Sequence, residues 1–312
     1  MQLFGKAKKK EGRLAIAIHA DGVLAAVVER RTDARPAVRM VLSYAGKKDQ
    51  AGASLARLNK DVQAVQYHCS SLLAAGEYQL LMVEAPNVPP EELKTAVGWR
   101  LKDMIDFPVA DATIAVADVP AAKNASAHNR QVFAVAARNS VIEPLQHLYA
   151  DSKIALSAID IQEMAQRNIS AMLEPEGRGL AMLSFDTEGG LLTVTFGGEL
   201  YLARRMDVTL TQLQGDEERE RHYDRITLEL QRSLDHFERQ FSFVTVSKLV
   251  LAPTGGVGLH GYLSSNLYIP VEMLDLATVL DFDKTPELND SAQQARYFLT
   301  LGAALRDEES VS

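Results

Sequence analysis

The most informative stretch of this chain is residues 14–30, LAIAIHADGVLAAVVER. Two apolar runs flank the turn His19-Ala20-Asp21-Gly22, and Asp-Gly between apolar runs is a strong signal for a β-hairpin. A second hairpin signal follows at residues 183–196, LSFDTEGGLLTVTF, with Gly189-Gly190 at its turn. We therefore expect two similar lobes that each open with a hairpin, and two lobes facing a cleft are a common way to build a ligand site.

The composition is that of a globular chain long enough for two lobes. Of its 312 residues, 47% are hydrophobic and 24% are charged, so it can bury a sizeable core and keep a soluble surface. The net charge of −8 argues against non-specific binding to nucleic acid. Cys69 is the only cysteine, which excludes an intrachain disulfide and suits a reducing compartment.

Basic residues gather in the first part of the chain, at Lys6, Lys8, Lys9, Lys10 and Arg13. We interpret residues 1–12 as a basic, flexible tail, which is either simply solvated or touches anionic lipid. The cluster interrupts any signal-peptide pattern, and no apolar run approaches the roughly 18 residues of a membrane span. A membrane role would therefore act through a partner or a surface contact.

The hydrophobic pattern predicts a mixed α/β chain. Strands are expected at residues 14–18, 23–28, 35–46, 78–86, 112–120, 132–137 and 154–160, three more within 180–208, and another from 247. Helices are expected at residues 53–75, 91–107, 140–152, 161–170, 215–241, 259–267 and 291–305. The loop at 174–179, EPEGRG, is a plausible boundary between a first lobe, 13–175, and a second lobe, 176–312.

Four stretches, with their order and spacing, carry a resemblance to a known family. They are EELKTAVGWRLKDMIDFPVADATIAVADVP (91–120), VFAVAARNSVIEPLQHLYADSKIALSAIDIQEMAQRNI (132–169), ITLELQRSLDHFERQF (226–241) and LVLAPTGGVGLHGYLSSNLYIPVEMLD (249–275). On these the chain resembles the PilM-type proteins of type IV pilus assembly within the actin-like ATPase superfamily, and most closely the branch that serves the MSHA pilus.

The resemblance implies a bilobed actin-like ATPase fold with a small inserted α+β subdomain, about residues 81–150, in the first lobe. It also implies a cytoplasmic protein, peripheral to the inner membrane, that docks the cytoplasmic tail of a bitopic, PilN-like inner-membrane partner. The assembly motor ATPase is a second implied partner.

The sequence departs from the superfamily at its nucleotide site. Such a site holds Mg²⁺ through carboxylates and phosphate through glycine turns. The first hairpin has Ala17 and His19 where the superfamily has Asp and Gly, and the second has Ser184; Asp21-Gly22 and Asp186 lie later in each turn. Thr254, Gly255 and Gly256 could still approach a nucleoside, or could merely connect a strand to a helix. We expect a vestigial site, with weak or absent ATP binding and no hydrolysis.

A partner peptide would lie extended in a groove between the inserted subdomain and the first lobe, where it would meet a strand edge and apolar pockets. Trp99, the only tryptophan, lies off the apolar stripe of its helix and either packs internally or contacts the partner. The candidate partner contacts are Trp99, Arg100, Leu101 and Phe107. The acidic chain suits a basic partner tail.

Other chemistry finds little support in the sequence. The seven histidines form no ligand pattern, and His68 and Cys69 would point apart on the expected helix, so no metal and no cofactor is expected. The competing hypotheses are an ATPase or small-molecule kinase of the same fold, which would need Asp21 or Asp186 as its carboxylate, and a filament-forming actin relative.

Overall fold

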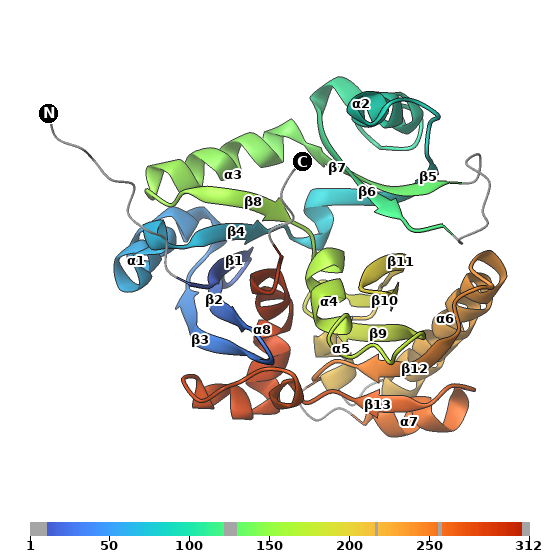
Figure 1. Cartoon of the computed structure of the whole chain (residues 1–312). Coiled ribbons are helices and arrows are strands. Elements are labelled where there is room, and N and C mark those ends of the chain that lie inside the picture. Colours follow the sequence, from blue (N-terminus) through green and yellow to red (C-terminus); the bar gives the residue numbers. More distant parts are fainter. Residues whose placement is uncertain (1–10, 122–129, 216–217, 255–257, 308–312) are drawn as a thin grey trace, which may run out of the picture.

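The computed structural model describes residues 11–121, 130–215, 218–254 and 258–307, and it contains two five-stranded sheets of matching topology (Figure 1). The first has the order β3-β2-β1-β4-β8, with β1 (Arg13–His19), β2 (Gly22–Arg31), β3 (Ala34–Ala45), β4 (His68–Leu72) and β8 (Leu156–Asp160). The second has the order β11-β10-β9-β12-β13, with β9 (Gly179–Phe185), β10 (Gly190–Phe196), β11 (Glu199–Met206), β12 (Val246–Leu251) and β13 (Val271–Met273). In each sheet three antiparallel strands are followed by two parallel ones. The two hairpins predicted from Asp21-Gly22 and Gly189-Gly190 are thus confirmed as the start of each sheet.

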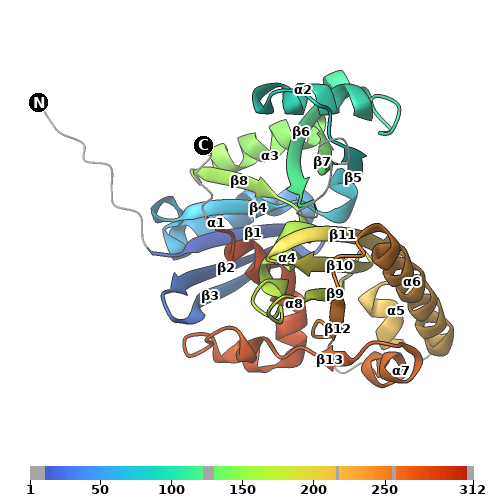
Figure 2. The ribbon, with the colours of Figure 1, turned by 45° about the vertical axis from the view of Figure 1, so that its right-hand side comes forward.

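Helices cover the outer faces of both sheets. On the first sheet, α1 (Ala51–Val62) and α3 (Asn139–Asp151) bury residues such as Leu55, Leu58 and Tyr149 against β1 and β2. On the second, α6 (Arg219–Gln240) and α7 (Leu259–Asn266) lie along one outer side (Figure 2), next to the short α5 (Leu210–Gln214). The apolar stripe predicted for the long helix is buried as expected: Tyr223, Ile226, Leu230, Leu234 and Phe237.

The helix predicted over residues 53–75 is wrong in its second half. α1 ends at Val62, Gln63 adopts φ 56°, and the chain then enters strand β4, which contains His68 and Cys69. β4 pairs in parallel with β1 on one side and β8 on the other, and Cys69 is fully buried. Because a central strand gains two ladders of backbone hydrogen bonds and burial on both faces, tertiary pairing overrides the helical spacing of the apolar residues.

A third, three-stranded sheet with the order β5-β7-β6 lies beside the two lobes. It comprises β5 (Tyr78–Glu84), β6 (Ala112–Val119) and β7 (Gln131–Arg138), and α2 (Pro90–Leu101) covers one of its faces. The predicted helix 91–107 is shorter in the structure, since residues 102–107 form turns before Pro108. This inserted sheet and α2 together occupy residues 78–138, whereas α3 packs on the first lobe.

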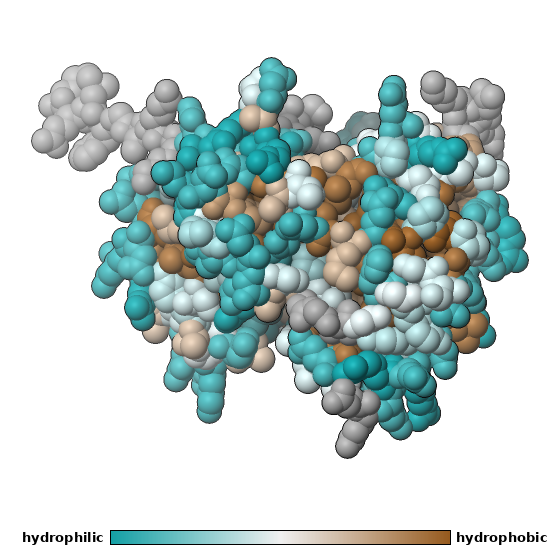
Figure 3. Space-filling view, turned by 90° about the horizontal axis from the view of Figure 1, so that it is seen from below, coloured by the Kyte–Doolittle hydropathy of each residue, from teal (hydrophilic) through white to brown (hydrophobic). Residues whose placement is uncertain are grey.

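Two helices lie between the lobes, α4 (Gln162–Ser170) and α8 (Ser291–Ala304) (Figure 1). They cross so closely that a Cβ added at Gly302 would lie 2.2 Å from the carbonyl oxygen of Ala165. Around them a single apolar core takes residues from both sheets, such as Ala17 and Leu24 from the first and Met182 and Val250 from the second. Seen from below (Figure 3), apolar side chains show mainly toward the middle of the face, with hydrophilic ones around them. The lobes are therefore joined by a shared core.

Candidate functional site

At the first hairpin, the position predicted for a lost carboxylate holds a buried alanine, and the acidic side chain of the turn is exposed. Ala17 is buried in β1, opposite Leu24 and Leu72, and His19 and Asp21 lie at the turn, where Asp21 is exposed. Gly22 has φ 154°, and a Cβ there would lie 2.3 Å from the carbonyl oxygen of Tyr44. Glycine is thus required because β3 crosses close to the turn.

At the second hairpin, the protein itself satisfies the polar groups. Ser184 is buried in β9, and its hydroxyl donates to Gln166 Oε1 over 2.5 Å. Gln166, on α4, donates through Nε2 to the carbonyl oxygens of Met182 and Leu191 and to Thr193 Oγ1, at 2.9–3.1 Å. The position that would hold a carboxylate therefore belongs to a closed hydrogen-bond network that ties α4 to two strands.

Asp186 builds the turn that follows. Its Oδ1 accepts hydrogen bonds from the backbone N–H groups of Glu188 and Gly189, at 2.7 and 3.0 Å. Burial is the main cause that raises the pKa of this carboxyl, and the two N–H groups oppose it. A carboxylate whose oxygen already serves its own turn is poorly placed to hold a metal ion.

The two lobes are tied together beside these turns. The backbone N–H of Ala75, in the loop after β4, donates to the carboxylate of Glu188 over 2.7 Å. Close by, Arg205 of β11 reaches Glu163 of α4 at 2.8 Å and the Tyr78 hydroxyl of β5 at 2.7 Å. Burial and the neighbouring Glu163 hold the pKa of Tyr78 well above its ordinary value, so its hydroxyl stays protonated and donates to Glu163. These contacts connect all three sheets.

The third predicted nucleotide element is only partly described. Thr254 is fully buried, and its hydroxyl has no hydrogen-bond partner among the described residues. Gly255 and Gly256 lie outside the described residues, as does the basic segment Lys6 to Lys10. In the described part of the chain, no three His, Cys, Asp or Glu side chains gather as they would to hold a metal ion.

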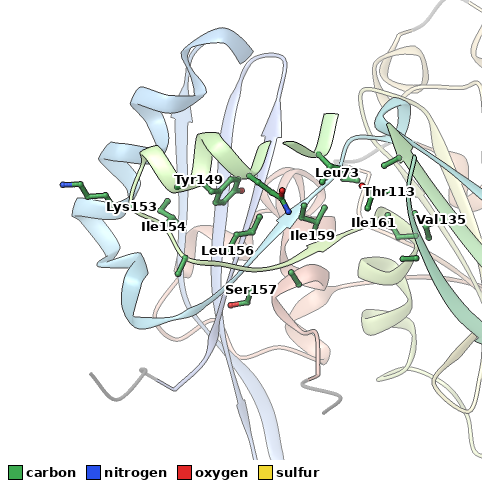
Figure 4. A pocket seen from close by; sticks show the side chains of 17 residues that line it. Leu73, Thr113, Val135, Tyr149, Lys153, Ile154, Leu156, Ser157, Ile159 and Ile161 are labelled. Atoms are coloured by element: carbon green, nitrogen blue, oxygen red, sulfur yellow. The ribbon is translucent and has the colours of Figure 1, made fainter. Parts of the chain in front are cut away.

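A groove of about 750 Å³ lies between the first lobe and the inserted sheet (Figure 4). One wall is β8, with Leu156, Ser157, Ala158 and Ile159, and the other is a face of the inserted sheet. α3 contributes its side chains from Ile142 to Ala150. Many of the lining side chains are small and leave space between the walls: Thr113, Ala115, Ala137, Ala150, Ala155 and Ala158. We name this space the inter-sheet groove.

Both sheets present an edge strand at the inter-sheet groove. β8 is the last strand of the first-lobe sheet, and β6 is the last strand of the inserted sheet. An edge strand carries backbone N–H and C=O groups that can pair with an added chain. The groove therefore combines the backbone groups of two edge strands with an apolar lining, which polar side chains such as Gln146 and Lys153 interrupt. Spacing along the sequence could not reveal it, since its walls come from four different elements, β6, β7, α3 and β8.

The predicted partner contacts lie elsewhere, around α2. Trp99 is 72% exposed, and Arg100 is exposed and pairs with Glu84 at 3.4 Å. Leu101 is fully buried in the core of the inserted subdomain, so its side chain has no surface to offer a partner in this structure. Phe107 is 7% exposed beneath the guanidinium of Arg138. Of the four, Trp99 and Phe107 line one hollow, which shares only Thr113 with the inter-sheet groove.

Comparison with known proteins identifies the architecture. No protein-family model and no curated protein matches the chain. Among solved structures it is similar to the "PilM-PilN type IV pilus biogenesis complex", with a TM-score of 0.73 at 20% identity over 95% of this chain and 98% of the other. It also resembles a protein of Bacteroides thetaiotaomicron with an actin-like ATPase fold and unknown function, with a TM-score of 0.50 at 12% identity over 92% and 99% of the two chains.

A third similar structure is the cytoplasmic domain of EpsL, an inner-membrane component of the type II secretion system of Vibrio cholerae. Its TM-score is 0.50 at 14% identity, over 95% of this chain and 96% of that one. No helix in the described part of this chain is both long and apolar enough to cross a bilayer. The paired five-stranded sheets, the crossing helices between them and these likenesses lead to one conclusion: the chain has the actin-like ATPase fold, with a small inserted subdomain in its first lobe.

Proposed function

We propose that this protein is a non-catalytic scaffold of a type IV pilus assembly platform, which docks the cytoplasmic tail of a bitopic, PilN-like inner-membrane protein. The inter-sheet groove carries this proposal, because it offers an extended chain two strand edges and an apolar lining at once. The similarity to PilM, whose solved structure is a complex with PilN, supports the same assignment. The protein would work at the cytoplasmic face of the inner membrane.

The finer assignment rests on the sequence stretches that resemble the MSHA pilus protein MshI. We propose that the platform served is an MSHA-like pilus and that the assembly motor ATPase is a further partner. A basic tail on the membrane protein suits the net charge of −8, which would speed encounter more than it tightens the complex.

The absence of catalysis is part of this proposal. An ATPase or kinase of the same fold would need carboxylates at the ends of β1 and β9, and those positions hold Ala17 and the hydrogen-bonded Ser184. The carboxylate of Asp186 supports its own turn, and Glu188 is engaged by Ala75. The described hairpins thus favour a docking body over an enzyme.

The groove can be tested by filling it. Ala115 is an exposed alanine of β6 that lines the inter-sheet groove, and Ala34 is an exposed alanine of β3 on the opposite side of the first lobe. We expect Ala115→Phe to weaken binding of a PilN-type cytoplasmic-tail peptide by about tenfold or more, roughly 1.4 kcal/mol, in isothermal titration calorimetry. Ala34→Phe is the matched control. Equal affinity for the two variants would contradict docking in this groove.

A further inference from the structure

A second hollow, of about 1120 Å³, lies on the α2 side of the inserted sheet, and we name it the α2 hollow. It is formed by one flank of α2, the turns that follow the helix, and β6. Its floor is apolar, with Ile105, Phe107, Val109 and Ile114. Figure 2 shows α2 at the outer end of the inserted subdomain, away from both lobes. The α2 hollow and the inter-sheet groove lie on opposite faces of the same sheet, because Ile114 packs toward α2 and Ala115 faces the groove.

The α2 hollow has a large aromatic side chain exposed at its rim. Trp99 is 72% exposed, more than any other large hydrophobic side chain in the described part of the chain. In the same lining, the Phe107 ring packs against Arg138, whose guanidinium lies 4.3 Å from the ring centre. Exposed tryptophan beside a preformed apolar hollow is typical of an interaction surface, where such a residue contributes much of the binding energy.

The charge at the rim is positive. Lys94 and Lys102 both line the hollow and are exposed, and neither forms an ion pair with a described residue. Asp106, the acidic residue of the lining, is balanced by Arg138 at 3.3 Å. The chain as a whole is acidic, which suits a basic ligand. The unbalanced charges of this hollow are two lysines, so the hollow suits an acidic ligand instead.

We propose that the α2 hollow docks an acidic amphipathic segment of a second protein partner, distinct from the tail in the inter-sheet groove. Apolar side chains of that segment fill the hollow beside Trp99, and its carboxylates meet Lys94 and Lys102. A protein segment fits better than an anionic bilayer, because a short segment can place its carboxylates at the two lysines alone, whereas a flat anionic surface would also meet the exposed acids Glu91, Glu92 and Asp103. Since the two binding surfaces lie on opposite faces of the sheet, both partners can be held at once.

Trp99 provides a direct readout, as it is the only tryptophan in the chain. The probe is a synthetic amphipathic helix of leucine and glutamate, compared with its leucine and lysine counterpart. We expect the glutamate peptide to shift the Trp99 emission to the blue and the lysine peptide to leave it unchanged. The charge reversal K94E/K102E should raise the dissociation constant about tenfold. The matched control, K60E/K284E, makes the same change in net charge at two other exposed lysines and should have little effect.

Several results would overturn this proposal. They are no shift with the glutamate peptide, an equal shift with the lysine peptide, or equal weakening by the control variant. A shift with phosphatidylglycerol vesicles in place of the peptide would assign the surface to the membrane, and a shift on raising the concentration of the protein alone would assign it to a second copy. Ala115→Phe changes no residue of the α2 hollow and should bind the glutamate peptide with unchanged affinity. The proposal for the inter-sheet groove and the proposal for the α2 hollow can therefore be refuted separately.

Discussion

Ser184 illustrates how one buried hydroxyl can tie a helix to a sheet. A carboxylate at the end of β9 would be available to a metal ion, but the serine hydroxyl is instead bonded to Gln166, which in turn bonds two strands. Ala17 of β1 likewise is not a carboxylate, and its methyl group is buried in the shared core. Neither position holds a carboxylate, and the hydroxyl of Ser184 is engaged by Gln166.

The single substitution Ala17→Asp is not expected to restore nucleotide binding. The side chain would be buried beside Leu24 and Leu72, where an unpaired carboxylate costs about 3 kcal/mol of the free energy of unfolding. Ala20→Asp, at the exposed turn, is the control and should change it by less than about 0.5 kcal/mol. Urea denaturation measures both. Calorimetry of the wild-type protein with ATP and Mg²⁺ should show no micromolar binding; such binding would refute the proposal of a vestigial site.

Helices α4 and α8 hold the lobes together through backbone proximity. Gly302 allows α8 to pass next to the Ala165 carbonyl, and Asn168 Nδ2 donates to the Gly302 carbonyl over 2.9 Å. A methyl group at residue 302 would collide with backbone, which cannot rotate away as a side chain can.

We therefore expect Gly302→Ala to lower the free energy of unfolding by about 2–3 kcal/mol, although alanine is the better helix former. Gly261, in α7, has open space where its Cβ would be, so Gly261→Ala should raise the free energy of unfolding by up to about 1 kcal/mol. Chemical denaturation of the two variants gives the comparison. If both alanines stabilised the protein, the close crossing of α4 and α8 would be disproved.

Across the whole molecule, a small polar cluster joins three parts of the chain. Arg205 of the second lobe bonds Glu163 of α4 and Tyr78 of the inserted sheet, and Glu163 is only 2% exposed. Removing one partner of a buried ion pair leaves the other charge without compensation. Exposed pairs behave differently, since water and salt already screen them.

Arg205→Met should lower the free energy of unfolding by about 1–2 kcal/mol, because Glu163 would stay buried without its cation, whereas the side chain of Arg205 is 33% exposed and water screens part of the attraction. The double variant Arg205→Met/Glu163→Gln should recover part of that loss, since no charge is then left buried. Arg225→Met is the control: its pairs with Asp207 and Glu229 are exposed, and about 0.5 kcal/mol or less is expected. A double-mutant cycle with no coupling between Arg205 and Glu163 would show that the cluster does not join the lobes.

Local sequence was sufficient for the repeated hairpins and most elements. Asp21-Gly22 and Gly189-Gly190 favour tight turns between strands. The apolar stripe of α6 repeats with the helical period, so each of these signals lies within a few residues of the sequence. The assignment of Ala17 and Ser184 as positions of lost carboxylates came from the resemblance and stays a prediction. The domain limits assigned from the loop at residues 174–179 and from the resemblance stay predictions.

Tertiary structure alone decided the strand at residues 68–72, the side chains that line the inter-sheet groove and the existence of the α2 hollow. β4 exists because β1 and β8 flank it, and neither neighbour is visible in the local pattern. The inter-sheet groove is bounded by Thr113, Val135 and Ile159, small and apolar residues that are unremarkable in sequence and become a site only where two sheet edges meet. Local dihedral preferences are encoded residue by residue, whereas a groove is the space left between elements far apart in the chain, and its location depends on how they pack.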